Sequence, residues 1–551
     1  MNRLITTHAL RKTCEPTLLW KFTAPEVLDE EELLLPVPGV WETHPRLGNY
    51  RGVGIYSKEM TLAGNVRFVF GGASFCARVC LDGKELTQHQ GAYTAFDCVA
   101  EDLSWGSHTL TVEVDNRFGE DDALHVPNDY YIYGGLNRPV TVEQLGSAWI
   151  RRMRAVPKKQ GRLWKVALQI EVVSLSDEDQ VIDVETRVAG AEHRWKGKQL
   201  HARETLVLEG ELAVGGVRLW SPETPNLYKI ETVLWQEGTP ADDLIDRIGF
   251  RELTTEGEKL LLNGQPLHLK GFNRHEDYAA FGCAIPEAAM VQDIQMMKEL
   301  GCNCVRSCHY PNDPRFLDLC DQYGLLVWEE GHARGLSEAQ MRNPHFLPQS
   351  EACLREMVAQ HINHPCIFTW GILNECVDNT PFGASCYAAL FRLLRELDPS
   401  RPVTTAMLSR QESLVIPDCD LISMNLYPRW NVDADCDAYI EDMRAWAQSK
   451  SEAPKPFIVS EIGAGAIYGF HDMNHAKWSE ERQADILREQ LEAVLGNLHI
   501  AGVFLWQFAD CRVDDSWFGA RPKTQNNKGI VDAYRRPKLA WQVVKDIFNT
   551  F

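Results

Sequence analysis

The stretch Ile367-Phe-Thr-Trp-Gly-Ile-Leu-Asn-Glu375 and the shorter stretch Pro456-Phe-Ile-Val-Ser-Glu461 decide the fold class. Each is a short apolar run that ends in a glutamate, which is typical of a buried strand in a parallel sheet. Because burying a carboxylate costs free energy, two of them at matching strand ends suggest a paired acid–base site. Cleavage of a glycosidic bond with retention uses two carboxyl groups that face one sugar. For either glutamate alone, a partly solvated strand end is the alternative.

Strands of this kind alternate with amphipathic helices from about residue 254 onward. The expected helices are 288–300, 316–323 and 388–397. Eight apolar runs in about 300 residues predict the eight parallel strands of a TIM (β/α)8 barrel. These runs are 268–272, 302–308, 325–329, 367–373, 403–406, 421–425, 457–460 and 502–507. Polar residues follow several of them, and TIM barrels place their chemistry at that carboxyl face.

The part of the chain that precedes the barrel has the pattern of β-structure throughout. Short alternating runs between turn residues predict a jelly-roll β-sandwich over residues 1–147. About a hundred further residues of alternating strands predict an immunoglobulin-like β-sandwich over 148–253. The expected order is therefore a jelly roll, an immunoglobulin-like sandwich and a catalytic barrel over 254–551.

Composition excludes several classes of protein. The 551 residues are 44% hydrophobic and 24% charged, which describes a globular chain, and a net charge of −21 opposes nucleic acid or an anionic membrane as a partner. No apolar stretch reaches about 18 residues, so no membrane span is expected. The start of the chain lacks the apolar core of a signal peptide, and sixteen cysteines then favour free thiols in a reducing, cytoplasmic compartment.

The densest cysteine cluster is Cys302-Asn-Cys304-Val-Arg-Ser-Cys308-His309. Thiolate and imidazole groups at such close spacing could bind zinc, but structural zinc sites need a second pair of ligands and a wider spacing. The same residues also form an apolar strand, and cysteine is among the most buried residue types. We therefore expect no metal and no organic cofactor.

The chain resembles the glycoside hydrolases of family 2, which group β-galactosidase, β-mannosidase and β-glucuronidase. The resemblance covers essentially the whole chain and has specific motifs. They are Leu219-Trp-Ser-Pro-Glu-Thr-Pro-Asn-Leu-Tyr228, Ile248-Gly-Phe-Arg251, Leu261-Leu-Asn-Gly-Gln-Pro266, Gly271-Phe-Asn-Arg-His-Glu276 and Val305-Arg-Ser-Cys-His-Tyr-Pro311. The family is usually oligomeric, so a homo-oligomer is expected.

The resemblance implies a role for each carboxylate. It gives Glu375 the role of acid/base and Glu461 the role of nucleophile. Asn374 is placed to hydrogen-bond the sugar 2-hydroxyl. Glu461 must stay ionised to attack the anomeric carbon, so it needs hydrogen-bond donors, for which we expect Tyr427 and Arg306.

The sugar is indicated by Asn526-Asn-Lys528, which follows Trp506-Gln-Phe-Ala-Asp510. This order resembles the Asn-x-Lys motif of β-glucuronidases, in which the amide and the ammonium hold the C6 carboxylate of a uronic acid. Charge-assisted hydrogen bonds of this kind are the strong ones. An ordinary solvated loop is the alternative for such a short motif.

Other candidate residues for the sugar site have weaker signals. Asp129 matches the first-domain loop that reaches the sugar hydroxyls in glucuronidases, although a turn aspartate is the alternative. Trp506 could stack on the pyranose or lie in the core. His275 and His309 are expected to line the site, since both lie past strand ends. Asn431 stands near the place where a glucuronidase offers a tyrosine to the sugar.

The sequence also departs from the glucuronidase pattern on the C4 and C6 side of the sugar. Ile462 stands where a tyrosine is usual, Gln507 where an asparagine is usual, and Arg334 where a short apolar residue is common. Galacturonate differs from glucuronate only at C4. An added donor such as Arg334 could therefore favour the axial hydroxyl, whereas a solvent-facing arginine is the alternative.

The sequence thus predicts a retaining exo-β-hexuronidase that acts on β-glucuronides, β-galacturonides or both, with a suspected galacturonide preference. A β-galactosidase or β-mannosidase of the same family is the alternative within this class. A carbohydrate-binding protein with an inactive barrel is the alternative from another class, and the presence of both glutamates argues against it.

Overall fold

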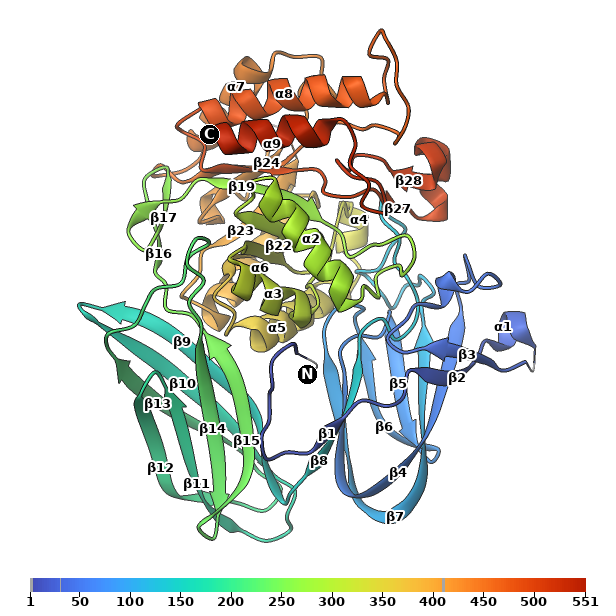
Figure 1. The fold of residues 1–551 in the computed structure, drawn as a ribbon, viewed down its shortest axis with the longest axis vertical. Helices are drawn as coiled ribbons and strands as arrows, with labels where there is room; N and C mark the ends of the chain where they lie inside the picture. The colour runs from blue at the N-terminus through green and yellow to red at the C-terminus, as the bar shows by residue number, and fades with distance from the viewer. Residues whose placement is uncertain (1–2, 30, 409–411) are drawn as a thin grey trace.

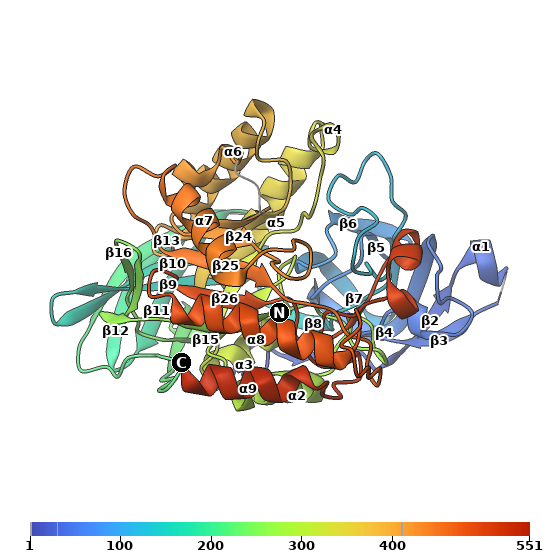
Figure 2. The ribbon, with the colours of Figure 1, turned by 90° about the horizontal axis from the view of Figure 1, so that it is seen from above.

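The computed structural model describes residues 3–29, 31–408 and 412–551. It consists of two β-sandwiches and a closed barrel, and Figure 1 shows the sandwiches side by side beneath the barrel. Seen from above, the two sandwiches lie on opposite sides of the barrel helices (Figure 2). The predicted fold class, a jelly roll and an immunoglobulin-like sandwich followed by a TIM barrel, is confirmed.

The N-terminal sandwich is one connected sheet of eight strands in the order β1-β8-β4-β7-β5-β6, with β2 and β3 joined to it through β4. The strands are β1 (Thr13–Cys14), β2 (Leu19–Thr23), β3 (Leu33–Pro36), β4 (Val53–Phe70), β5 (Cys76–Leu81), β6 (Lys84–Gln90), β7 (Phe96–Asp115) and β8 (Val140–Leu145). A four-residue helix, α1 (Pro25–Leu28), and a 3-10 turn, η1 (Trp41–Thr43), connect them. The two long strands β4 and β7 pair with a register shift on either side of Gly64, and such bulges let a long pair bend around a core.

The second sandwich has a three-stranded sheet, β13-β10-β9, and a four-stranded sheet, β12-β11-β14-β15. Its strands are β9 (Ala148–Gln160), β10 (Leu163–Ser174), β11 (Gln180–Val188), β12 (Ala191–Leu200), β13 (Thr205–Val214), β14 (Tyr228–Gln236) and β15 (Thr239–Ile248). Every second residue of β10 is buried, from Trp164 to Ser174. This period of two places one face of each sheet against the shared core.

The barrel closes through eight parallel strands in chain order, from β19 to β26. They are β19 (Leu269–Arg274), β20 (Cys304–Ser307), β21 (Leu326–Glu330), β22 (Ile367–Asn374), β23 (Val403–Leu408), β24 (Ile422–Asn425), β25 (Phe457–Ile462) and β26 (Gly502–Leu505). All eight residues of β22 are buried because the barrel interior and the outer helices cover both faces. Each of the eight apolar runs identified in the sequence contains one of these strands or most of it.

Helices surround the barrel and alternate with its strands. They are α2 (Glu287–Glu299), α3 (Pro314–Tyr323), α4 (Glu338–Met341), α5 (Phe346–His361), α6 (Pro381–Leu397), α7 (Cys436–Gln448), α8 (Glu480–Gly496) and α9 (Ala540–Thr550). Local sequence sets their ends, as α3 illustrates. The Asp313 side chain accepts a hydrogen bond from the backbone N–H of Arg315, Pro314 occupies the first turn, and Gly324 ends the helix with a φ of 68°.

Short elements complete the chain. A small sheet of β16 (Leu253–Glu256), β17 (Lys259–Leu262) and β18 (Gln265–Pro266) precedes the barrel, and η2 (Ile416–Asp418) lies between β23 and β24. After the last barrel strand, β27 (Cys511–Arg512) pairs with β28 (Gln525–Asn526). The connection between them contains η3 (Asp515–Ala520) and η4 (Pro522–Thr524). It forms a loop next to the N-terminal sandwich (Figure 1).

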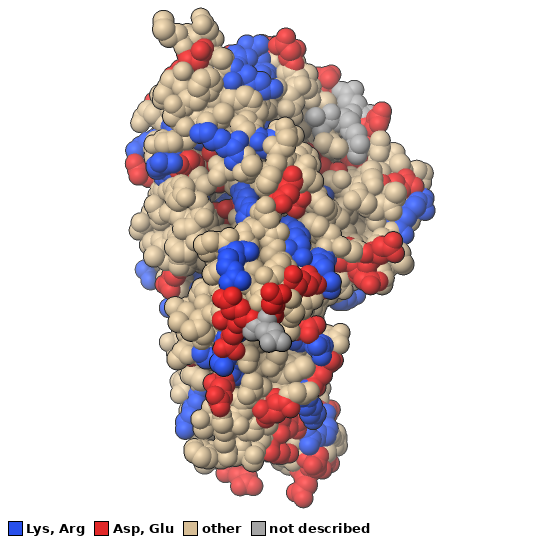
Figure 3. Space-filling model, turned by 90° about the vertical axis from the view of Figure 1, so that its right-hand side faces the viewer, with Lys and Arg blue, Asp and Glu red and all other residues tan. Residues whose placement is uncertain are grey.

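No helix within the described part of the chain has the length and apolar character needed to span a membrane. All sixteen cysteines are free thiols. The face on the right-hand side of Figure 1 carries basic and acidic side chains interspersed with one another (Figure 3).

Candidate active site

Glu461 lies inside β25 and not after it, because its backbone pairs with Asn425 of the neighbouring strand β24. Its two carboxylate oxygens have different donors. Arg306 of β20 donates from Nη1 to Oε1 at 3.0 Å, and the Tyr427 hydroxyl donates to Oε2 at 2.7 Å. Both donors were expected from the sequence, and the geometry places both of them on the carboxylate.

Arg306 is fully buried and connects several polar groups beneath the site. Its Nε and Nη2 each donate at 2.9 Å to Glu330 at the end of β21, and its Nη1 donates to Asn273 at 2.8 Å. A further bond at 2.9 Å runs from Nη2 to Asn374. The bidentate contact with Glu330 fixes the plane of the guanidinium. It therefore also fixes the position of the Nη1 group that donates to Glu461.

Glu375 follows β22 directly and has a positive φ of 52°. A non-glycine residue in this region carries backbone strain of about 1 kcal/mol or more, and such strain gathers at functional sites. The carboxylate accepts a hydrogen bond at 2.9 Å from Asn425, and Arg334 lies 3.5 Å from its other oxygen. The side-chain Nδ2 of Asn374 is buried and has no hydrogen-bond partner among the described residues, so it is free to donate to a bound molecule.

The negative charge of Glu375 acts on the carboxyl group of Glu461. Burial raises the pKa of Glu461, and the negative charge of Glu375 raises it further, whereas Arg306 and the Tyr427 hydroxyl oppose the shift. Burial likewise raises the pKa of Glu330 to about 7 against the effect of Arg306. Buried carboxyl groups with raised pKa values, such as Glu461 and Glu330, are typical of acid–base sites.

A cationic subsite lies at the same end of the barrel. Lys528 is 8% exposed, and its Nζ lies 4.3 Å from the centre of the Tyr427 ring. Among the described residues no carboxylate lies within ion-pair distance of it, and burial lowers its pKa to about 8. Asn526 is fully buried, and its Nδ2 donates to Asp129 at 3.0 Å.

Trp506 and two histidines form an aromatic wall of the site. The Trp506 and His309 rings stack with centroids 5.1 Å apart, and His275 meets Trp506 edge-on at 5.4 Å. Trp506 also packs with Tyr427 and Cys308 in a small buried cluster. A hydrogen bond of 2.9 Å joins His309 Nδ1 to Glu330 Oε1, so this wall is connected to the polar residues around Glu461.

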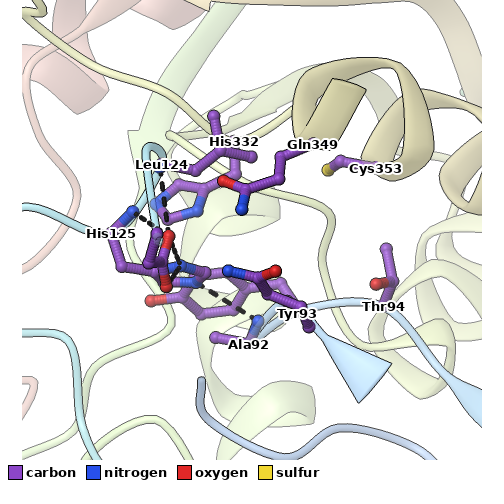
Figure 4. Close-up of a pocket in the computed structure, with 11 residues that line it drawn as sticks. Ala92, Tyr93, Thr94, Leu124, His125, His332, Gln349 and Cys353 are labelled. Carbon is purple, nitrogen blue, oxygen red and sulfur yellow. Dashed lines mark hydrogen bonds and ion pairs between the residues drawn. The ribbon is translucent and has the colours of Figure 1, made fainter. Parts of the chain in front are cut away.

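The N-terminal sandwich holds the loop that carries Arg334. Asn128 accepts a hydrogen bond from Arg334 Nη1 at 3.0 Å, and the Tyr130 hydroxyl lies 3.1 Å from His332 Nε2. The His332 ring in turn packs edge-on against His125 at 4.5 Å beside a small cavity (Figure 4). Arg334 is half-buried in the site and is not a surface residue.

The structure brings most of the sequence-predicted residues to the carboxyl end of the barrel. Contacts and charge effects join the following residues into one region: Glu375, Glu461, Arg306, Asn374, Tyr427, His309, Trp506, Arg334, Asp129, Asn526 and Lys528. Asn431 is different, since it is exposed in the loop after β24 and its backbone N–H donates to Tyr427 O at 3.0 Å.

The cysteine cluster divides between two environments. Cys302 and Cys304 belong to the hydrophobic core of the barrel, whereas Cys308 lies beside Tyr427 and Trp506. Ligand atoms of Cys308, His309 and His275 lie within 4.8 Å of one another. His309 is already engaged with Glu330, and burial raises the pKa of the Cys308 thiol well above its usual range, which keeps it protonated and a poor metal ligand.

Sequence reasoning placed Asn425 at the carboxyl end of a barrel strand but missed two other residues of this region, Glu330 and Arg521. Glu330 ends a barrel strand, so its position was a usable signal for a site residue. Arg521 gave no such signal, because it lies in an irregular loop. Its guanidinium forms a bidentate ion pair with Asp129, which is 392 positions away in the chain.

Comparisons with known proteins agree with this architecture. The family model described as "Glycosyl hydrolases family 2, TIM barrel domain" matches residues 253–551, and that described as "Glycosyl hydrolases family 2" matches residues 148–251. The chain therefore belongs to glycosyl hydrolases family 2, and it is a glycoside hydrolase.

Individual relatives are uronidases. A solved β-galacturonidase of this family from Eisenbergiella tayi, bound to galacturonate, is 46% identical, with a TM-score of 0.97 over 100% of this chain and 99% of that chain. A β-glucuronidase from Bacteroides uniformis is 26% identical, with a TM-score of 0.87 over 98% of this chain and 69% of that chain. The curated β-glucuronidase of Sus scrofa is 28% identical over 517 residues, which are 85% of this chain and 76% of the relative.

Proposed function

We propose that the protein is a retaining exo-β-hexuronidase that removes a terminal β-galacturonosyl residue in preference to a β-glucuronosyl one. The observation that carries this proposal is the position of Lys528. Its buried ammonium has no carboxylate partner among the described residues, and it lies against Tyr427, which donates to Glu461. A buried unpaired cation beside a pair of carboxylates suits a sugar that brings its own carboxylate.

The first chemical step uses both glutamates. Glu461 Oε attacks the anomeric carbon and forms a glycosyl ester, while Glu375 gives its proton to the glycosidic oxygen, so the aglycone leaves as an alcohol. In the second step Glu375, now a carboxylate, takes a proton from water. The resulting nucleophilic oxygen attacks the anomeric carbon, and Glu461 leaves as a free carboxylate. The net configuration is retained because the anomeric centre is inverted twice.

The surrounding residues support these roles. Arg306 and Tyr427 stabilise the negative charge that returns to Glu461 each time the ester breaks. The free Nδ2 of Asn374 supplies a donor for the sugar 2-hydroxyl, and a hydrogen bond at that position strengthens in the transition state. Asn526 and Lys528 supply an amide and an ammonium for the C6 carboxylate.

A preference for galacturonides is supported by two observations. Arg334 extends into the site next to Glu375, where a guanidinium offers fixed donors to an axial 4-hydroxyl. The 46% identical relative is a β-galacturonidase with galacturonate bound. The chain is also similar to β-glucuronidases, but at a lower identity.

The test compares three substrates with one leaving group: 4-nitrophenyl β-D-galacturonide, β-D-glucuronide and β-D-galactoside. We expect kcat/KM to fall in that order. A galactoside cleaved as well as either uronide would contradict the assignment to hexuronides. No turnover of any of the three would favour a carbohydrate-binding protein.

A further inference from the structure

Arg521 is a second cation near the carboxylate subsite. It lies between η3 and η4, in the loop that joins β27 to β28. Two N–H groups of its guanidinium donate to the carboxylate of Asp129, Nε to Oδ1 at 2.7 Å and Nη2 to Oδ2. The Arg521 side chain is 18% exposed and that of Asp129 is 6% exposed, so the ion pair lies at the wall of the site and not on the open surface.

Asp129 links Arg521 to the Asn-x-Lys motif. The same Oδ2 that Arg521 contacts also accepts the bond from Asn526 at 3.0 Å. The Asp129 carboxylate therefore bridges Arg521 and Asn526. Its positive charge is also the largest charge effect on Lys528, after burial, and it contributes to lowering the pKa of Lys528 to about 8. Such an effect requires the two cations to be near each other.

The two cations of this subsite have donors that no carboxylate occupies. Arg521 contacts Asp129, which also accepts a hydrogen bond from Asn526. Lys528 forms no ion pair with a described carboxylate, although the charges of Asp129, Glu461 and Glu375 act on it. Arg521 uses Nε and Nη2 for Asp129, and its Nη1 makes no hydrogen bond to any described residue. The buried Oδ1 of Asn526 also has no partner among the described residues, but this oxygen only accepts, so it suits a sugar hydroxyl and not a carboxylate. A guanidinium with free N–H groups, beside an unpaired ammonium, is suited to receive a carboxylate.

We infer that Arg521 is a binding residue for the C6 carboxylate of the uronide, and that it acts together with Lys528 and Asn526. This inference rests on the proposed hexuronidase function. Asp129 then has two roles: it holds the guanidinium in place, and it accepts a sugar hydroxyl on its remaining lone pairs. The β27–β28 connection, which comes after the last barrel strand, contributes a specificity residue to the site through Arg521.

The test measures kcat/KM for 4-nitrophenyl β-D-galacturonide and the matching galactoside in Arg521→Ala and in Arg521→Gln. We expect the uronide-to-galactoside ratio to fall about ten- to a hundred-fold, which is typical for loss of a charge-assisted hydrogen bond. Lys523→Ala is the matched control, because it removes an exposed cation from the same loop. That variant should keep the wild-type ratio. Thermal unfolding identifies variants whose fold has changed.

A second background separates direct binding from charge compensation. If Arg521 only neutralises Asp129, adding Asp129→Asn to Arg521→Ala should restore the uronide-to-galactoside ratio to the wild-type value. If Arg521 binds the uronide, the double variant should keep the lowered ratio. A wild-type ratio in the double variant overturns the inference.

Calorimetry with D-galacturonate and D-galactose gives a readout that is independent of turnover. Arg521→Ala should weaken the binding of galacturonate about ten-fold or more and leave the binding of galactose nearly unchanged. Equal weakening of both sugars would overturn the inference. Failure of the wild-type protein to cleave either uronide would instead refute the proposed function, which the substrate comparison tests by itself.

Discussion

Glu461 and Glu375 stand at the same edge of the barrel, but their surroundings differ. The side chain of Glu461 is 5% exposed and that of Glu375 is 15% exposed. Glu461 receives short bonds from two residues with buried side chains, Arg306 at 3.0 Å and Tyr427 at 2.7 Å. Glu375 receives one short bond from Asn425, and its other partner is the guanidinium of Arg334 at 3.5 Å.

The difference corresponds to the chemistry that each carboxylate performs in the proposed mechanism. A nucleophile must offer an oxygen in a fixed position and remain charged, which requires strong donors on rigid elements. An acid/base must lose and regain a proton, so short bonds from cations to both of its oxygens would hinder it. Glu375 accordingly has one short bond, from Asn425, and a longer contact of 3.5 Å with the loop residue Arg334.

Removing either carboxylate should have the largest effect on turnover. Glu461→Gln and Glu375→Gln should each reduce kcat for a galacturonide by about a thousand-fold or more, since each removes a separate contribution to the transition state. The two variants should differ with a substrate whose leaving group needs no protonation, such as a dinitrophenyl galacturonide. That substrate should restore much of the activity of Glu375→Gln but little of that of Glu461→Gln. Near-normal turnover in either variant would refute the roles.

Removal of the Lys528 ammonium tests the carboxylate subsite while both glutamates remain. Lys528→Ala should lower kcat/KM for a galacturonide by about ten- to a hundred-fold, because a charge-assisted bond to a buried carboxylate is lost. Cleavage of the galactoside should change far less. Equal losses with the charged and the neutral substrate would show that Lys528 supports the fold and does not bind the uronate.

Removal of Arg334 tests the weaker contact at Glu375. The Arg334→Ala variant should lower the ratio of kcat/KM for galacturonide over glucuronide by about ten-fold, the effect of one well-placed hydrogen bond from a charged donor. Any general effect on the acid/base cancels in this ratio, because both substrates use Glu375. If both values fall equally, Arg334 acts on Glu375 alone and the preference at C4 comes from other residues.

The pH dependence gives the smallest expected effect. In the proposed function Lys528 binds the uronate as an ammonium. Because burial lowers the pKa of Lys528 to about 8, uronide binding should weaken as the pH rises through that value. The profile of kcat/KM, which reports the free enzyme, should fall about two-fold at the pKa and about ten-fold one pH unit above it. The galactoside profile and that of Lys528→Ala should lack this limb. A limb of equal size with the galactoside would assign the titration to another group.

Sequence reasoning identified the barrel because its strands are buried on both faces. Such strands are continuous apolar runs, as in Ile367–Asn374, and their number and spacing predict the closed sheet before any contact is known. The same logic located Glu375 and Glu461. Burying a carboxylate at the end of such a run costs free energy, so its presence there indicates a functional site. The predicted donors Arg306, in β20, and Tyr427, just after β24, reach Glu461 because the eight barrel strands are parallel and their carboxyl ends meet at one edge.

The exact end of strand seven and the role of Glu330 required the folded structure. Where a strand ends depends on its register with the neighbouring strand. Glu461 belongs to β25 because it pairs with Asn425 of β24. Glu330 is one of two adjacent glutamates at the end of β21. Only the packing shows that Glu330 grips Arg306, while Glu329 contacts His361 at 2.8 Å.

The sequence by itself determined the fold class, the two carboxylates and the Asn-x-Lys motif, because each is encoded in a short contiguous pattern. Only the tertiary structure decided that Arg334 turns inward to Glu375, that Asn431 is exposed, and that Arg521 joins Asp129. The physical reason is that these side chains lie on loops without periodic constraint. Their partners come from other parts of the chain, up to 392 positions away, and local sequence carries no signal for such distant pairs.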